Sequence, residues 1–187
     1  IKVTRNIKVT RNIKVTRKLN LLSLKAEGKI WIRLGLVSGC VIFVDQITKY
    51  IIKINLSLYD NIIVIEKFFN ITHILNPGGA FGLLASQSPE IRKFIFLFMS
   101  SIVALFVLWF YKKTASNFVF LSYGLALIFG GAVGNLIDRF KYGKVVDFLD
   151  FYIGSLHWPA FNVADSAISI GMGILIYHIL FNKIPDF

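Results

Sequence analysis

Four aspartates lie at or near the ends of long apolar segments, where a lipid bilayer makes a carboxylate costly. They are Asp45, Asp138, Asp147 and Asp165. Ionisable groups within or beside membrane spans are expensive enough that each one suggests a function. Two neighbouring carboxylates can also share a proton and so hold different charge states. The four residues therefore suggest acid–base chemistry at a membrane.

Other chemistries have weaker support in the sequence. Cys40, the only cysteine, is expected near mid-bilayer without a neighbouring base, so we interpret it as a packing residue. Ser166 follows Asp165 but has no Lys or His beside it. The histidines are dispersed and no His-Glu-x-x-His motif occurs, so we expect no metal site and no cofactor. What remains is a water molecule activated by one ionised aspartate, while its protonated partner polarises a carbonyl.

The elements that must position these groups are predicted to be membrane helices. The chain has 187 residues, 56% of them hydrophobic, and a mean hydropathy of +0.67, which is too apolar for a soluble domain of this size. Four apolar runs are each about 20 residues long, enough to cross a bilayer as a helix. They comprise residues 31–52, 94–111, 118–137 and 163–181. We therefore predict an all-α membrane protein with four transmembrane helices.

A long segment between the first two runs has a different pattern. Residues 61–65 and 69–75 are strand-like, and a Gly/Pro-rich turn, Asn76-Pro77-Gly78-Gly79, follows them. Because irregular backbone cannot lie bare in lipid, we expect this segment at the membrane surface or buried against the helices.

The positive charge lies mostly in the first residues. The net charge is +11, and residues 1–33 contain ten Lys and Arg against Glu27 alone. We interpret this as a basic cytoplasmic flank before a first span, and we expect no binding of nucleic acid. The loop with Lys112 and Lys113 falls on the same side, so both termini are predicted to be cytoplasmic and both longer loops to face outward.

A repeated hexapeptide occupies the start of this flank. The sequence Ile1-Lys2-Val3-Thr4-Arg5-Asn6 recurs twice, with the last residue changed in the third copy. An edge strand or a membrane-surface segment would fit its alternation of apolar and polar residues, but we favour a low-complexity extension with little role in activity. We predict a tail over residues 1–29 and a single integral-membrane domain over residues 30–187.

With helices running in alternating directions, polar residues far apart in sequence converge at the outer membrane face. Asp45 lies deep in the first span, about 21 Å from its inner end. The others are Asn135, Asp138 and Arg139 at the end of the third run, Asn162 and Asp165 at the start of the fourth, and Asp147 between them. Such convergence indicates a site. The alternative is a set of independent caps, and Asp165 in particular fits a cap of the fourth helix.

Five motifs carry a family resemblance over about residues 31–181. In order they are Asp45-Gln46-Ile47-Thr48-Lys49, Asn76-Pro77-Gly78-Gly79-Ala80-Phe81, Gly130-Gly131-Ala132-Val133-Gly134-Asn135-Leu136-Ile137-Asp138-Arg139, Val145-Val146-Asp147-Phe148 and Phe161-Asn162-Val163-Ala164-Asp165-Ser166-Ala167. This order strongly resembles bacterial lipoprotein signal peptidase, also called signal peptidase II. The resemblance implies a four-helix membrane bundle with a small extracytoplasmic β-cradle between helices 1 and 2, in the bacterial cytoplasmic (inner) membrane. It also implies an aspartic endopeptidase that cuts prolipoproteins before a diacylglyceryl-modified cysteine.

The resemblance assigns roles residue by residue. Asp147 and Asp165 match the catalytic pair, a choice that spacing alone does not make over Asp138 or Asp150. Asp45 and Lys49 match a charged pair on the first helix. The remaining matches, Asn76, Asn135, Asp138, Arg139 and Asn162, are expected to bind substrate or support the site. The implied partners are a diacylglyceryl-prolipoprotein and membrane lipid, and we expect a monomer.

Two other functions remain as alternatives. A small transporter or proton relay also places carboxylates in a helix bundle, but it more often has them at mid-membrane with broken, repeated helices. The second alternative is that the chain is itself a lipoprotein, because Leu36-Val37-Ser38-Gly39-Cys40 resembles a lipobox. Arg33 interrupts the preceding run, and the three further spans are unlike a cleaved lipoprotein.

Overall fold

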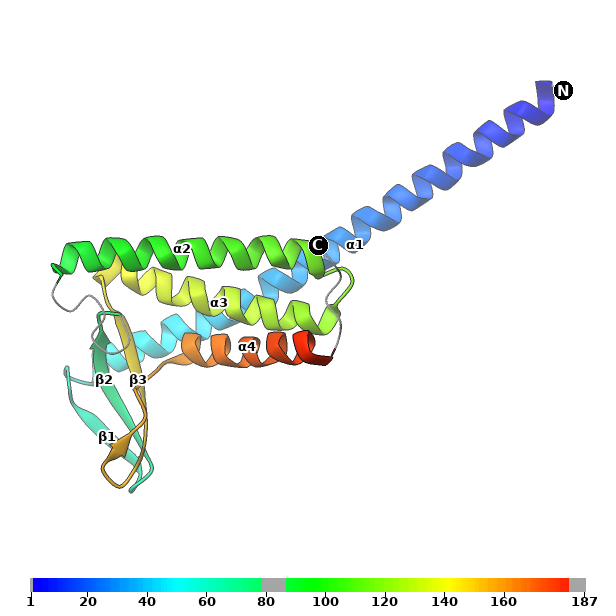
Figure 1. Ribbon diagram of the computed structural model, residues 1–187. Helices are drawn as coiled ribbons and strands as arrows, with labels where there is room; N and C mark the ends of the chain where they lie inside the picture. Colours follow the sequence, from blue (N-terminus) through cyan, green and yellow to red (C-terminus); the bar gives the residue numbers. More distant parts are fainter. Residues whose placement is uncertain (1, 79–86, 182–187) are drawn as a thin grey trace.

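The computed structural model describes the backbone of residues 2–78 and 87–181, and the side chains from Glu27 onward. Its elements in order are α1 (Lys2–Asn55), β1 (Asn61–Ile65), β2 (Phe69–Asn76), α2 (Pro89–Thr114), α3 (Val119–Tyr142), β3 (Val145–Ile153), β4 (Leu156–His157) and α4 (Val163–Phe181). The four helices form a bundle, and the strands lie together at one end of it (Figure 1).

The four predicted spans are confirmed. Within the described residues, the helices long and apolar enough to cross a membrane are Glu27–Asn55, Pro89–Thr114, Val119–Tyr142 and Val163–Phe181. α3 is the central helix, since it contacts each of the other three. Three of the helices, α1, α2 and α3, are longer than their apolar runs, and local signals set the ends of two of them. Ser88 caps α2 by accepting a hydrogen bond from the Ile91 N–H, and α3 continues to Gly143, which ends it at φ +70°.

The sheet is built from two separate parts of the chain. Strands β1 and β2 match the two strand-like segments predicted between the first two helices and pair antiparallel, whereas β3 and β4 come from the connection between α3 and α4. These last two strands were not predicted from the sequence. β2 pairs antiparallel with β3, placing Ile74 opposite Asp147 and Asn76 opposite Val145. The predicted turn after β2 is described as far as Gly78; Gly79, Ala80 and Phe81 lie outside the described residues.

The basic tail is helical from Lys2, and its backbone continues α1 beyond the bundle without a break at residue 29 (Figure 1). The edge-strand alternative for the repeat is therefore wrong. A strand needs a partner for its hydrogen bonds, whereas a helix satisfies them within its own segment, and no proline interrupts this one. The division into a tail and a membrane domain stays a prediction.

The bundle has an apolar end and a polar end. Away from the sheet, buried side chains of the first three helices pack into one core, among them Leu34, Tyr111, Leu121 and Leu125. Near the sheet the most deeply buried side chains include charged and amide groups instead. Burying such groups is stable only if they are paired, so most of the polar groups at this end are expected to bind one another.

Candidate active site

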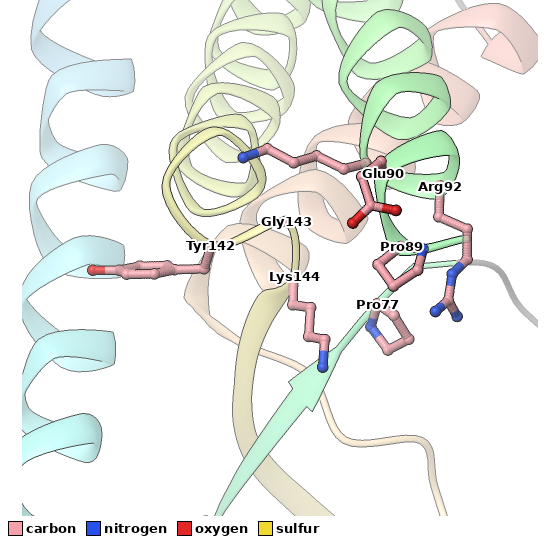
Figure 2. Close-up of a pocket in the computed structure, with 8 residues that line it drawn as sticks. Pro77, Pro89, Glu90, Arg92, Tyr142, Gly143 and Lys144 are labelled. Atoms are coloured by element: carbon pink, nitrogen blue, oxygen red, sulfur yellow. The ribbon is translucent and has the colours of Figure 1, made fainter. Parts of the chain in front are cut away.

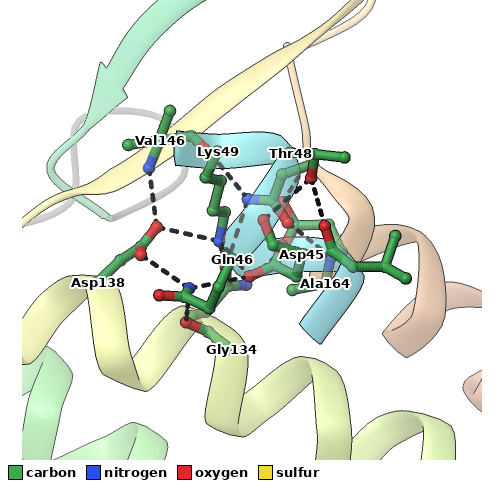
Figure 3. A network of polar contacts seen from close by, with 12 residues as sticks. Asp45, Gln46, Thr48, Lys49, Gly134, Asp138, Val146 and Ala164 are labelled. Atoms are coloured by element: carbon green, nitrogen blue, oxygen red, sulfur yellow. Dashed lines mark hydrogen bonds and ion pairs between the residues drawn. The ribbon is translucent and has the colours of Figure 1, made fainter. Parts of the chain in front are cut away.

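A buried lysine joins two helices at the polar end. The Lys49 ammonium lies 2.9 Å from Asp45 Oδ2 and 3.0 Å from Asp138 Oδ2, and it donates a 3.0 Å hydrogen bond to Asn135 Oδ1. All four side chains are at most 4% exposed. An ammonium group has three hydrogens, so each one has an acceptor. Lys49 therefore links α1 to α3 with no donor left free (Figure 3).

The two carboxylates of this network also accept hydrogen bonds from distant backbone. Asp45 Oδ1 accepts from the Ala164 N–H at 2.9 Å, and Asp138 Oδ2 accepts from the Val146 N–H at 3.2 Å. Gln46 Nε2 lies within 3.2 Å of both carboxylates and of the Gly134 carbonyl (Figure 3). The network thus holds the backbone of Val146 and Ala164 in place, and these residues directly precede Asp147 and Asp165.

Asp147 lies on β3 and is held by two amides. Asn76 Nδ2 donates to its Oδ2 at 2.9 Å, and Asn162 Nδ2 donates to its Oδ1 at 2.7 Å. Asn76 reaches it diagonally across the β2–β3 pair, because Asn76 is paired with Val145, two residues away on the same face. The Gly78 N–H donates to Asn76 Oδ1, which leaves the Asn76 amide hydrogens for Asp147.

Asp165 lies in the first turn of α4. Its Oδ1 accepts from Asn135 Nδ2 at 2.7 Å. Its Oδ2 accepts from the Asn162 N–H at 3.3 Å, while its own N–H donates to Asn162 Oδ1 at 2.9 Å. This reciprocal pair is a capping box, so Asp165 does cap α4, as the alternative interpretation proposed. Capping is only one of its two roles. One oxygen caps the helix and the other belongs to the polar site.

Asn162 is the residue that touches both candidate catalytic carboxyls. It is fully buried, and its amide nitrogen points to Asp147 while its oxygen points to Asp165 N–H. Asn135 completes the chain, because its oxygen faces Lys49 and its nitrogen faces Asp165. Through Asn135, the Lys49 network is connected directly to the carboxyl pair.

Burial sets the protonation of Asp147. The side chain is 2% exposed, and this desolvation raises its pKa from 3.8 to about 6. The hydrogen bonds from Asn76 and Asn162 favour the charged form and oppose the rise, whereas the negative charge of Asp165 adds to it. A proton therefore stays on Asp147 at a pH where an exposed aspartate is ionised.

Arg139 lies beside the pair without bonding to it. Its Nη1 donates to Ser100 Oγ on α2 at 3.1 Å, and its buried Nε has no hydrogen-bond partner among the described residues. Together with Asn135, Asp165 and Ser100 it lines a cavity of about 270 Å³ between α2, α3 and α4. A fork of donors beside an aspartate and a cavity is suited to hold a carbonyl group.

The structure brings all nine sequence-predicted site residues to one end of the bundle. It separates them into a lysine network, with Asp45, Lys49 and Asp138, and a carboxyl pair with its amides. Gln46, Ser100 and the backbone amides of Val146 and Ala164 were not predicted. Gln46 adjoins Asp45 in its motif, but neither Ser100 nor a backbone amide leaves a signal in a single sequence.

Cys40 and His157, whose side chains could serve other chemistries, lie away from the site. Cys40 is exposed on α1, and His157 pairs with Asp150 on the far part of the sheet. Among the described residues, no group of three or more His, Cys, Asp or Glu side chains is arranged to hold a metal ion.

The fold is shared with known membrane proteins. Two solved structures, each described as a bacterial membrane enzyme, superpose on this chain with a TM-score of 0.70. One is 35% identical and covers 82% of this chain and 93% of its own; the other is 34% identical and covers 80% and 94%. The chain is a multi-pass membrane protein with the fold of these two enzymes.

Sequence comparison gives the family. The family model for signal peptidase (SPase) II matches residues 37–181. A lipoprotein signal peptidase of Desulforapulum autotrophicum is 63% identical over 155 residues, 83% of this chain and 96% of the relative. One of Syntrophus aciditrophicus is 44% identical over 141 residues, 75% and 88%. The chain belongs to the signal peptidase II family.

Proposed function

We propose that this protein is an aspartic endopeptidase that removes signal peptides from diacylglyceryl-modified prolipoproteins, cutting before the lipidated cysteine. The single observation that carries the proposal is the bridge that Asn162 makes between Asp147 and Asp165. It holds two carboxyls at one end of a membrane bundle, where a peptide emerging from the bilayer is accessible. The curated relatives are named lipoprotein signal peptidases, and no observation favours the transporter or lipoprotein alternatives.

In the proposed reaction, the pair shares one proton. The ionised carboxyl accepts a proton from water as the water oxygen attacks the scissile carbonyl carbon, and the protonated carboxyl donates its proton to the carbonyl oxygen. The tetrahedral intermediate then collapses: the C–N bond breaks, the leaving nitrogen takes a proton from the carboxyl that received one from water, and a hydroxyl of the intermediate returns its proton to the other carboxyl, which restores the starting pair. No covalent intermediate forms. The raised pKa of Asp147 supports its assignment as the carboxyl that starts protonated.

The neighbouring polar groups position the substrate in this scheme. Arg139 has a buried Nε without a partner among the described residues and lines the cavity beside Asp165, so it is suited to receive a backbone carbonyl of the peptide. Asn76 is exposed at the end of β2 while it holds Asp147, so it is placed between the solvent side and the pair. Such orientation lowers the barrier of the reaction as well as improving affinity.

The lipid on the substrate is proposed to position the cleavage site. Both aspartates lie at the end of the bundle, so two acyl chains in the bilayer are suited to hold the modified cysteine at their level, and two chains anchor far more firmly than one. We place the termini in the cytoplasm, the site at the outer face of the bacterial inner membrane, and the active form as a monomer.

The test is cleavage of one precursor with and without its diacylglyceryl group, in matched detergent. The lipidated form is expected to be cut and the unmodified form to be a poor substrate, with an Asp165→Asn variant as the inactive control. Equal rates for the two precursors would show that the lipid is not recognised. The enzyme would then be a general membrane aspartic protease.

A further inference from the structure

A second cavity lies at the same end of the bundle, apart from the candidate active site. It measures about 330 Å³ and is lined by the start of α2, the end of α3 and Pro77 after β2. It shares no lining residue with the cavity beside Asp165. Its volume is within the range of small-molecule sites.

The charge of this cavity is mostly positive and unpaired. Arg92, Lys93 and Lys144 line it, against Glu90 alone. No ion pair within 4.0 Å involves any of these four among the described residues. The Nε of Arg92 is buried and has no hydrogen-bond partner there. A buried donor without an acceptor is costly in a native protein, and it indicates a missing anionic or polar ligand.

Two of the cationic groups flank one opening. Figure 2 shows the guanidinium of Arg92 and the ammonium of Lys144 extending on either side of Pro77. Tyr142 is turned away toward α1, where the Lys53 ammonium lies 3.6 Å from its ring centroid, so it leaves the opening clear. Two cations that flank one opening, one of them a planar guanidinium, are suited to hold a phosphate group.

The surroundings of the cavity are those of a lipid headgroup. α2 begins here and continues as an apolar span, and the first large side chains on its outer surface are Ile91, Phe94 and Phe98, which are 47%, 71% and 57% exposed. Phe94 and Phe98 stack with ring centroids 6.3 Å apart. Acyl chains beside these side chains would lead directly to a headgroup at Arg92. Basic pockets between membrane helices on the cytoplasmic or matrix side bind anionic headgroups, and this cavity offers the same chemistry at the opposite face.

We propose that this cavity binds the phosphodiester of an anionic phospholipid, with Arg92 and Lys144 flanking the phosphate, Lys93 in the wall of the cavity and the acyl chains along α2. In the orientation proposed above, these basic residues lie on the side where Lys and Arg are usually depleted, and a lipid ligand accounts for their presence there.

The test measures the Tm of the purified full-length protein in detergent with three additives at equal concentration. They are phosphatidylglycerol, phosphatidylcholine and glycerol phosphate without acyl chains. Phosphatidylglycerol is expected to raise Tm by about 3 °C at tenfold excess over Kd, and the other two are not. Native mass spectrometry counts the lipid that stays bound.

Two variants that remove the same number of charges make the result specific. The double variant Arg92→Gln/Lys144→Gln is expected to lose the shift and the bound lipid, whereas Lys112→Gln/Lys113→Gln, at the opposite end of α2, keeps both. If the first double variant does not fold, Arg92→Lys keeps the charge without the Nε donor and is expected to show a smaller shift than the wild type.

Three outcomes would overturn the proposal. They are equal stabilisation by the anionic and the zwitterionic lipid, a full shift in every cavity variant that folds, and a full shift with glycerol phosphate alone. The last would assign the cavity to free phosphate. Neither the Tm measurement nor the mass spectrometry involves proteolysis, so the test does not depend on the proposed enzyme activity.

Discussion

Lys49 determines which way the side-chain amide of Asn135 faces. Its ammonium group can only donate, and it lies 3.0 Å from Asn135 Oδ1, so the Asn135 nitrogen must face away from it. That nitrogen donates to Asp165 Oδ1 at 2.7 Å. A charge buried in α1 therefore controls a hydrogen bond to a proposed catalytic carboxyl in α4, and it does so through an amide on α3.

Lys49→Met is expected to destabilise the protein by about 3–5 kcal/mol, because it leaves the buried carboxylates of Asp45 and Asp138 without a counter-charge. Thermal or chemical unfolding measures the loss. Lys53→Met is the matched control: it lies one turn further along α1, is exposed and contacts the Tyr142 ring. Adding Asp138→Asn to Lys49→Met should restore part of the stability. If the double variant is no more stable than Lys49→Met, the charge explanation fails.

Asp147→Asn and Asp165→Asn are each expected to reduce cleavage of a diacylated precursor by many orders of magnitude, since either carboxyl is indispensable to a shared-proton mechanism. Asp150→Asn is the control, because Asp150 lies on the same strand but contacts Asn70 and His157. Its activity should stay near that of the wild type. Near-normal turnover in either of the first two variants would contradict the assignment of the pair.

The value of kcat/KM is expected to fall as the pH rises through about 6, because the free enzyme then loses the proton that burial retains on Asp147. Asn76→Ala removes a hydrogen bond that lowers this pKa, so it should move the descending limb to higher pH. Asn70→Ala is the control, since Asn70 is on the same strand but donates to Asp150. A limb that moves equally in both variants, or to lower pH in Asn76→Ala, would refute the assignment to Asp147.

Gly131→Ala is expected to separate α3 from α4. A Cβ at Gly131 would lie within contact distance of the Ala164 carbonyl oxygen and 2.7 Å from Ile168 Cγ1. Overpacking of this kind typically costs about 1–3 kcal/mol, and a shift of about 1 Å at Asp165 would reduce cleavage about 100-fold. Gly39→Ala is the control, because nothing lies within 4 Å of its Cβ position. It should keep full activity and fold at least as stably as the wild type.

Deletion of residues 1–17 is expected to leave cleavage in detergent nearly unchanged. These residues precede every matched motif, and the family model matches only from residue 37. The comparison is the specific activity of the truncated and full-length proteins at equal concentration. Loss of activity in the truncated enzyme would show that the repeat contributes to the fold or to the substrate site.

The helices were predictable because length and hydropathy alone define a membrane span. The polar site was predictable at the level of depth, since Asp45, Asp138 and Asp165 occur where alternating helices bring them to one end. The first two strands were also visible, because residues 61–65 and 69–75 have β-branched and aromatic side chains between turn signals.

The strand that carries Asp147 was not predictable from its own sequence. Residues Val145–Ile153 adjoin an apolar helix and lack the alternation of a half-buried strand, and their burial pattern shows that most of them are enclosed. Only the pairing with β2, which is 71 residues away at Asn76 and Asp147, gives this segment its conformation. The helical tail was missed for a different reason: the alternating polarity of the repeat is typical of a strand, whereas the structure continues α1 through it without a proline to interrupt the helix.

The division of the sheet between two loops has a consequence for the newly made protein. When a ribosome has produced only α1, β1, β2 and α2, the amide of Asn76 and the ammonium of Lys49 have none of their later partners on α3 and β3. Both aspartates of the proposed pair are translated after that half, and α4, which carries Asp165, is made last. Under the proposed mechanism, an incomplete chain in the membrane therefore cannot cut its neighbours, and proteolytic capacity begins only when the last helix has been inserted.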